Sequence, residues 1–140
     1  MTDSVQADLA LRLAEAVALA NADRFDEAIR LLDRLRDAHP TVVHLTGFLG
    51  GTLYRAGRLD EAVGLLRQAA AAAPNKDLPS IALFHCLWGL DRHSEACDEL
   101  VRFLRSYESE LYRELLSDLG WKFDRDTGTL TEAQLPESDG

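Results

Sequence analysis

The hexapeptide Asp23-Arg24-Phe25-Asp26-Glu27-Ala28 returns as Gly57-Arg58-Leu59-Asp60-Glu61-Ala62 and again as Asp91-Arg92-His93-Ser94-Glu95-Ala96. Each copy follows the previous one by 34 residues. A fixed period of this length is typical of a repeat architecture, in which one supersecondary unit is copied and stacked so that neighbours bury one another. We therefore expect a solenoid, a class of fold that holds partners more often than it performs chemistry.

Each copy lies between two segments whose apolar residues recur at helical spacing. The pattern predicts six paired helices, over residues 7–20, 25–38, 42–56, 59–73, 79–90 and 94–104. Asp77 is placed to cap the fifth helix, and the prolines of His39-Pro40 and Pro74-Asn75 end the second and the fourth.

A seventh helix is expected over residues 109–119. Leu111, Leu115 and Leu119 recur every four residues, with Tyr112 and Leu116 beside them, and this apolar face would cover the exposed end of the stack. Gly120 would end the helix. The sequence thus divides into a repeat domain over residues 1–120, with repeats at about 7–40, 41–74 and 75–108, and a tail over residues 121–140. Within the tail, a short hairpin is expected around Arg125-Asp126-Thr127-Gly128, with a loose polar segment from Gln134 onward.

The period and its contents resemble the tetratricopeptide repeat (TPR) family, whose units are helix-turn-helix pairs. Its small residue in the second helix corresponds to Ala28, Ala62 and Ala96, and its large apolar residue four positions later to Leu32, Leu66 and Leu100. Its proline corresponds to Pro40 and Pro74, and its first-helix positions to Ala16 and Gly50, then to Leu19, Leu53 and Leu87. The third copy departs: Glu108 replaces the proline, and Phe84 and Phe103 replace small residues.

The resemblance implies an all-α fold, a right-handed α-solenoid of three TPR helical hairpins plus a C-terminal capping helix. It also implies a concave groove lined by the first helix of each repeat. Carried onto this sequence, the groove positions are Leu13, Val17, Asn21, His44, Phe48, Gly51, Tyr54, Arg55, Ile81, His85 and Trp88.

This set is apolar and aromatic, and Arg55 is its single formal charge. The carboxylate clamp of the subfamily that binds acidic chaperone tails is absent, because Leu13 and Val17 replace its first Lys and Asn. The expected partner is therefore a protein or peptide with apolar anchors, such as an amphipathic helix or an extended segment. Three alternatives stay open: these residues are core, a second copy covers them, or the chain's own tail covers them with Trp121, Phe123, Leu130 and Leu135.

Charge and hydropathy exclude other classes of partner. The net charge of −9 and the pI of about 4.8 argue against nucleic acid and anionic membranes. No apolar run approaches the ~18 residues of a membrane helix, and the N-terminus lacks a secretory signal, so a cytoplasmic location is expected. Arg outnumbers Lys by thirteen to two, which suggests a GC-rich bacterial genome.

Residues with chemical potential are scattered. His39, His44, His85 and His93 form no ligand pattern, although His44 and His85 could approach each other, and no metal or cofactor is expected. Asp124-x-Asp126-x-Gly128 lacks the remaining ligands of a calcium loop and is interpreted as a turn. Cys86 and Cys97 are expected to be small buried hydrophobes, with a disulfide between them as the alternative.

These observations predict a protein that is not an enzyme. The leading hypothesis is a non-catalytic protein–protein interaction module, a small bacterial adaptor or chaperone that holds an apolar segment of its partner in the groove. The second is a structural subunit or homo-oligomer whose groove is filled by its own tail or by a second copy. The third is an accessory subunit of an enzyme, without chemistry of its own.

Overall fold

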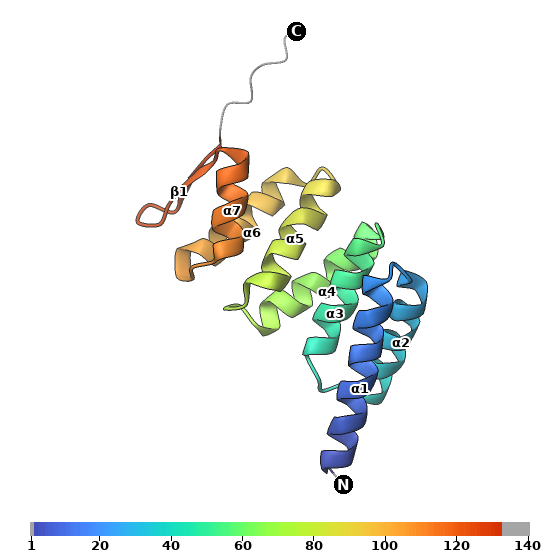
Figure 1. The fold of residues 1–140 in the computed structure, drawn as a ribbon. Coiled ribbons are helices and arrows are strands. Elements are labelled where there is room, and N and C mark those ends of the chain that lie inside the picture. Colours follow the sequence, from blue (N-terminus) through green and yellow to red (C-terminus); the bar gives the residue numbers. More distant parts are fainter. Residues whose placement is uncertain (1, 133–140) are drawn as a thin grey trace.

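The computed structural model describes residues 2–132, and side chains from residue 4 onward. This part of the chain forms seven α-helices followed by a two-stranded hairpin (Figure 1). Their bounds are α1 Thr2–Asn21, α2 Phe25–Ala38, α3 His44–Arg55, α4 Leu59–Ala72, α5 Asp77–Gly89, α6 His93–Ser106, α7 Glu110–Leu119, β1 Lys122–Asp124 and β2 Thr129–Thr131. The predicted all-α solenoid of helical hairpins with a capping helix is confirmed.

The helices pack in sequence order, which is the signature of a solenoid. α1 packs on α2, α3 on α4 and α5 on α6, and the hairpins join through the contacts of α2 with α3 and of α4 with α5. Figure 1 shows α1, α3, α5 and α7 following one another along the stack, with the N-terminus at one end and the β-hairpin at the other. α1 begins at Thr2, earlier than the helix expected from residue 7, and runs past the end of α2.

The first residue of each hexapeptide lies in the left-handed region of backbone conformation. φ is +60° at Asp23, +79° at Gly57 and +61° at Asp91. Glycine adopts this conformation freely, and aspartate is among the residues that tolerate it best. The repeated sequence is therefore a turn that reverses the chain between two antiparallel helices.

The remaining hexapeptide positions close that turn. The backbone N–H of the arginine donates to a carbonyl at the end of the preceding helix, with N–O distances of 2.9 Å for Arg24–Leu19, 2.9 Å for Arg58–Leu53 and 2.8 Å for Arg92–Leu87. The arginine side chain pairs with the glutamate three residues later, as in Arg24–Glu27, Arg58–Glu61 and Arg92–Glu95. The last residue, Ala28, Ala62 or Ala96, is 0% exposed, so no larger side chain fits without moving a helix.

The core changes character along the stack. In the first two repeats the small positions, Ala16 and Gly50, are buried, and a Cβ on Gly50 would lie 3.0 Å from Leu66. In the third repeat Phe84 and Phe103 are buried instead. Their rings contact residues of α7 and of the segment after it: Phe84 lies 6.4 Å from Tyr112 and 6.2 Å from Trp121, and Phe103 lies 5.6 Å from Tyr112. The third repeat and the cap thus share one aromatic core.

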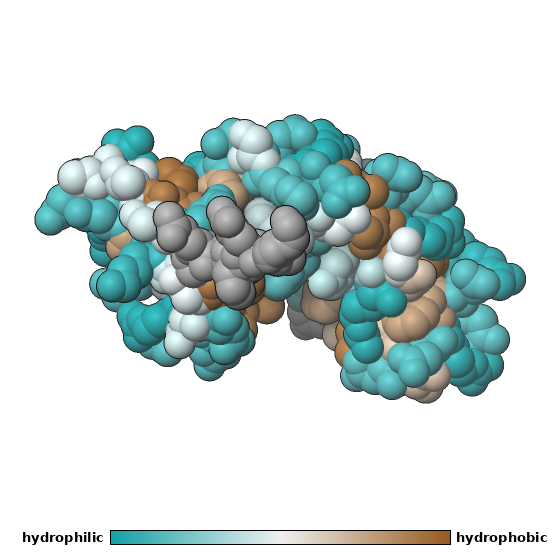
Figure 2. All heavy atoms as spheres, turned by 90° about the horizontal axis from the view of Figure 1, so that it is seen from above, coloured by the Kyte–Doolittle hydropathy of each residue, from teal (hydrophilic) through white to brown (hydrophobic). Residues whose placement is uncertain are grey.

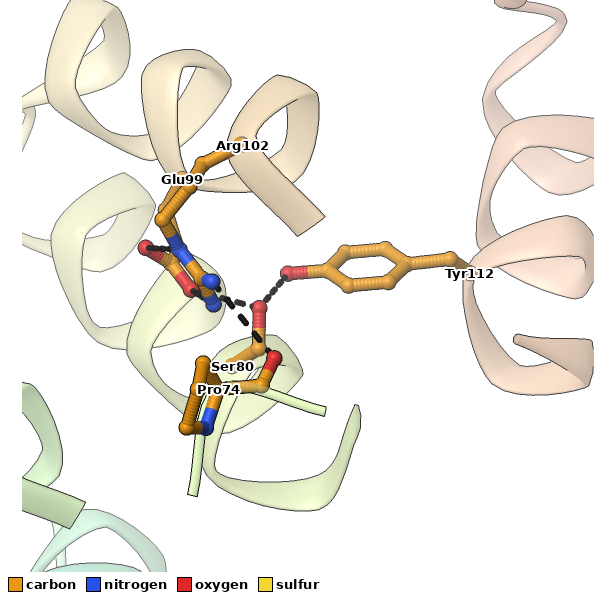
Figure 3. Close-up of polar contacts among 5 residues, drawn as sticks. All are labelled: Pro74, Ser80, Glu99, Arg102 and Tyr112. Atoms are coloured by element: carbon orange, nitrogen blue, oxygen red, sulfur yellow. Dashed lines mark hydrogen bonds and ion pairs between the residues drawn. The ribbon is translucent and has the colours of Figure 1, made fainter. Parts of the chain in front are cut away.

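A buried polar network joins the same elements (Figure 3). The Ser80 hydroxyl lies 2.7 Å from the Tyr112 hydroxyl and donates to Glu99 over 2.6 Å. Because Ser80 has one proton and donates it to the carboxylate, Tyr112 must donate to Ser80. Arg102 holds Glu99 through two hydrogen bonds and also donates to the carbonyl of Pro74. The network ties α5, α6 and α7 together and satisfies the one polar atom of the fully buried Tyr112.

One local prediction for this region was wrong, and another holds for part of its residues. Asp77 does not cap α5: it is the first helical residue, and its carboxylate accepts a hydrogen bond over 2.6 Å from Ser109, the residue that caps α7. The apolar face of α7 covers the stack through Tyr112, which is buried, and through Leu115 and Leu116, which pack against the core, whereas Leu111 and Leu119 are each 37% exposed. Tyr112 is the most deeply buried residue of this face, and Ser80 provides a partner for its hydroxyl.

The segment after α7 folds back on the stack. Gly120 has φ of +70° and ends α7, and the two strands pair antiparallel with Phe123 opposite Leu130. Asp124 Oδ1 accepts hydrogen bonds from the backbone N–H groups of Asp126 and Thr127, and these bonds hold the turn. Leu135 and the segment from Gln134 onward lie outside the described residues.

Candidate partner-binding surface

The predicted groove residues lie on α1, α3 and α5, and we call this set the groove surface. Leu13 and Val17 of α1 are half-buried, as are Gly51 and Tyr54 of α3 and Ile81, His85 and Trp88 of α5; Asn21, His44, Phe48 and Arg55 are exposed. Half-buried side chains are expected where a helix packs on its neighbours with one face and exposes the other face to solvent. On the face drawn in Figure 2, hydrophobic residues form separate areas within a largely hydrophilic surface.

The structure brings part of this set together as a ladder of rings. Tyr54 stacks on His85 at 6.2 Å, and the ladder continues through Phe84 to Trp88, with centroid distances of 5.5 Å from His85 to Phe84 and 5.7 Å from Phe84 to Trp88. Burial disfavours charge on these groups: it lowers the pKa of His85 and raises that of Tyr54. The ladder is thus a largely neutral aromatic strip running from the second repeat into the third, with Tyr54, His85 and Trp88 half-buried and Phe84 buried beneath the surface.

The single formal charge of the surface is already engaged. Arg55 donates to Asn21 Oδ1 over 3.3 Å and to the backbone carbonyl of Ala20 over 3.2 Å, and its guanidinium lies 5.7 Å from the ring centroid of Phe25. These contacts place a cation at the carbonyl end of α1, where the helix dipole favours it. Arg55 and Asn21 therefore join the first repeat to the second.

Beyond the ladder, α3 offers an open apolar area. Phe48 is 42% exposed, although phenylalanine is usually buried. A Cβ added to Gly51 would meet nothing within 4 Å, whereas one added to Gly47 would touch Ala69. The backbone beside Phe48 is thus accessible from outside, which leaves room for the side chain of a partner.

Other predicted residues are not drawn together. His44 is the first residue of α3, and His85 packs instead against Tyr54 and Phe84. Among the described residues, no group of three or more His, Cys, Asp or Glu is arranged to hold a metal. Cys86 is buried and Cys97 half-buried, both are free thiols, and burial raises the pKa of each to about 11.

One residue at this surface comes from the tail, which was one of the alternatives left open for covering the groove. Trp121 is 8% exposed and lies on Trp88 at 5.4 Å, so the chain itself covers the end of the aromatic ladder. The signal in the sequence was the apolar content of the tail, in which Trp121 is the first residue after the end of α7 at Gly120.

Two hollows in the described part of the chain lie outside the groove surface. One of about 170 Å³ is lined by the end of α6, α7 and the hairpin, and another of about 680 Å³ lies between α1 and α2. Neither includes a residue of the groove surface. No helix from residue 2 to residue 132 is both long and apolar enough to cross a membrane.

Comparisons with known proteins agree with this architecture. The tetratricopeptide repeat family model matches residues 13–77, which confirms the resemblance seen in the sequence. This repeat is typically a non-catalytic protein-interaction fold.

Solved structures of two MamA mutants share the fold. One has a TM-score of 0.61 and 23% identity and covers 68% of this chain, and the other has a TM-score of 0.64 and 22% identity and covers 73%. The chain spans 52% of the length of the first and 74% of the second. At this level of identity the likeness concerns the fold alone. No curated protein sequence matches the chain significantly.

Proposed function

From the premise of a tetratricopeptide repeat fold, we propose that this chain is a non-catalytic adaptor or chaperone that holds an apolar segment of a protein partner on the groove surface. The observation that supports this most directly is the open area beside Phe48 and Gly51, next to a neutral aromatic strip. An exposed aromatic side chain beside accessible backbone is a common anchor point in protein interfaces.

The partner we propose presents an uncharged apolar face. Arg55 is engaged by Asn21 and Ala20, so the surface offers no free cation for an acidic tail. The aromatic strip follows successive helices, which suits an amphipathic helix or an extended strand with several apolar anchors.

A pair of glycine substitutions tests this proposal. Gly51→Leu fills the open area, and Gly64→Leu is the matched control because Gly64 is exposed on α4 and its Cβ would also meet nothing within 4 Å. Leucine favours helix over glycine, so both variants should keep their helicity and stability. The expected result is that the protein captured by the wild type from the native host is lost with Gly51→Leu and kept with Gly64→Leu.

Phe48→Ala provides a second, independent variant. Because the Phe48 ring is largely exposed, its removal should leave the fold intact and weaken partner binding by at least about tenfold, as expected for an interface anchor. Equal capture by the wild type, Gly51→Leu and Phe48→Ala would reject this surface. A mass measurement of the purified protein at high salt separates a monomer with a partner from a homo-oligomer.

A further inference from the structure

Trp121 and Trp88 form a contact between the groove surface and the C-terminal segment. Trp88 is the last ring of the aromatic ladder, and it contacts His93 at 4.1 Å and Trp121 at 5.4 Å. Trp121 also contacts Phe84 at 6.2 Å. Trp88 therefore belongs to the groove surface and is also covered in part by the C-terminal segment of the same chain.

The backbone around Gly120 directs Trp121 to that position. Gly120 has φ of +70°, which turns the chain back toward α5, and the N–H of Trp121 donates to the carbonyl of Leu116 over 2.9 Å. The C-terminal end of α7 thus fixes the start of the segment. Beyond Trp121, the hold must come from the hairpin.

The hairpin has few contacts with the helices. Phe123 and Leu130 are opposite each other and only half-buried, and each strand has three residues. Two-stranded sheets of this size are marginal by themselves. The hairpin is therefore attached to the stack through the partly buried side chains of Phe123 and Leu130, which pack against the core.

The polar tethers of the hairpin are also exposed. Arg125 pairs with Glu108 over 3.5 Å with both side chains largely in solvent, and the Cys97 thiol donates to Glu132 over 3.4 Å. Exposed ion pairs of this kind contribute little to stability. Release of the hairpin therefore costs few strong polar contacts, and the main cost of displacing the whole segment is the exposure of Trp121.

We propose that residues 121–132 form a strap that holds Trp121 over Trp88, and that a partner segment that reaches Trp88 must displace this strap. The strap would give the groove surface a closed and an open state. This proposal rests on the proposed function, since the two states differ in function only if the groove surface binds a partner. In the closed state a partner can contact the area around Phe48, Gly51 and Tyr54. In the open state it can also contact Trp88 and Phe84.

A disulfide between the strap and α6 tests the movement. The Cys97 thiol donates to the end of the Glu132 side chain, so Glu132→Cys puts a second thiol in the same region of the strap. Loss of these two free thiols on mild oxidation shows that the disulfide has formed and the strap is locked. Adding Cys97→Ser to the same variant gives a control that cannot form the bond. In the wild type, the strap amides of Phe123 and Leu130 should exchange hydrogen at least tenfold faster than the amides of α5 and α6. The oxidised lock should slow them at least tenfold, and the control should not. Strap amides that exchange only as slowly as α5 would overturn the proposal.

Partner capture then tests the consequence. The oxidised lock should bind the captured protein more weakly than the reduced form, whereas Trp121→Ala should bind it more strongly because Trp88 is uncovered. If Trp121→Ala does not fold, the lock still decides, since it leaves the core unchanged. If the locked and reduced forms bind equally while Gly51→Leu still loses binding, the strap is rejected and the proposed function stands. Binding unaffected by Gly51→Leu rejects the proposed function, while hydrogen exchange still decides whether the strap opens.

Discussion

The first two repeats and the third repeat fill the space between their helices with different side chains. In the first two, small residues such as Ala16 and Gly50 let helices approach closely, and the space between them is filled with leucine. In the third, Phe84 occupies the corresponding position, and the volume is filled by rings shared with α7 and Trp121. The difference shows that a repeat can abandon its small residue when the next element supplies side chains that fit around a large one.

The sharpest test of this difference is to give the third repeat the small residue of the other two. Phe84→Ala matches the family pattern, yet it removes a buried ring that contacts Trp88, Tyr112 and Trp121. We expect a loss of about 3–5 kcal/mol in the free energy of unfolding, as for other buried Phe→Ala changes. Urea titration followed by circular dichroism measures it; a loss below about 1 kcal/mol would mean that the aromatic core is not required.

The reverse experiment places a larger side chain at a helix crossing in the second repeat, where leucines fill the core. Ala62 is 0% exposed between α3 and α4, so Ala62→Leu should cost about 1–3 kcal/mol through overpacking. The same titration applies, with Gly64→Leu as a control on the exposed side of α4. A variant that unfolds at the same urea concentration as the wild type would place Ala62 away from the crossing.

A pair of buried hydroxyl groups compares the two regions directly. Ser80→Ala removes the partner of Tyr112 and one partner of Glu99, so we expect a loss of about 1–3 kcal/mol. Thr52 is also buried, but its hydroxyl only donates to the Phe48 carbonyl of its own helix, so Thr52→Val should cost less than about 1 kcal/mol. Equal effects in urea titrations would show that the Ser80 network adds nothing beyond an ordinary hydroxyl.

The smallest effect expected is a dependence on pH at the junction of the two regions. Burial lowers the pKa of His85, so the unfolded chain takes up a proton near pH ~6.5 while the folded chain stays neutral to lower pH. The contribution of His85 to stability is therefore complete above this pH and declines as the pH falls, until the lower folded pKa is passed. His85→Gln should reduce the difference between urea midpoints measured at pH 7.5 and 5.5, and an unchanged difference would assign it to other groups.

Much of the fold can be predicted from the sequence because the signal is local and repeated. The left-handed residue, the Arg–Glu pair and the buried alanine all lie within six residues, so three copies of the hexapeptide fix three turns and their helix crossings. The cap is harder to predict. Leu111, Leu115 and Leu119 have ideal helical spacing, but spacing does not reveal that Ser80, more than 30 residues earlier, accepts the hydroxyl of Tyr112.

The groove surface shows the same limit. Residue positions carried over from the family indicate which helices line it, yet they do not reveal that Arg55 is bound to Asn21 or that Trp121 covers Trp88. Both contacts join residues 33 or 34 positions apart, and each depends on how two units sit against each other. Sequence periodicity specifies the repeated unit more firmly than the side-chain contacts between units.

The position of the tryptophans has a consequence for any optical study of this chain. The protein has two, Trp88 and Trp121, and they touch. Their emission therefore reports on the C-terminal half alone, while the first two repeats carry no indole and stay silent. Far-ultraviolet circular dichroism reports on all helices. If the denaturation curve from tryptophan emission differs from the curve from dichroism, the difference measures how independently the two halves unfold.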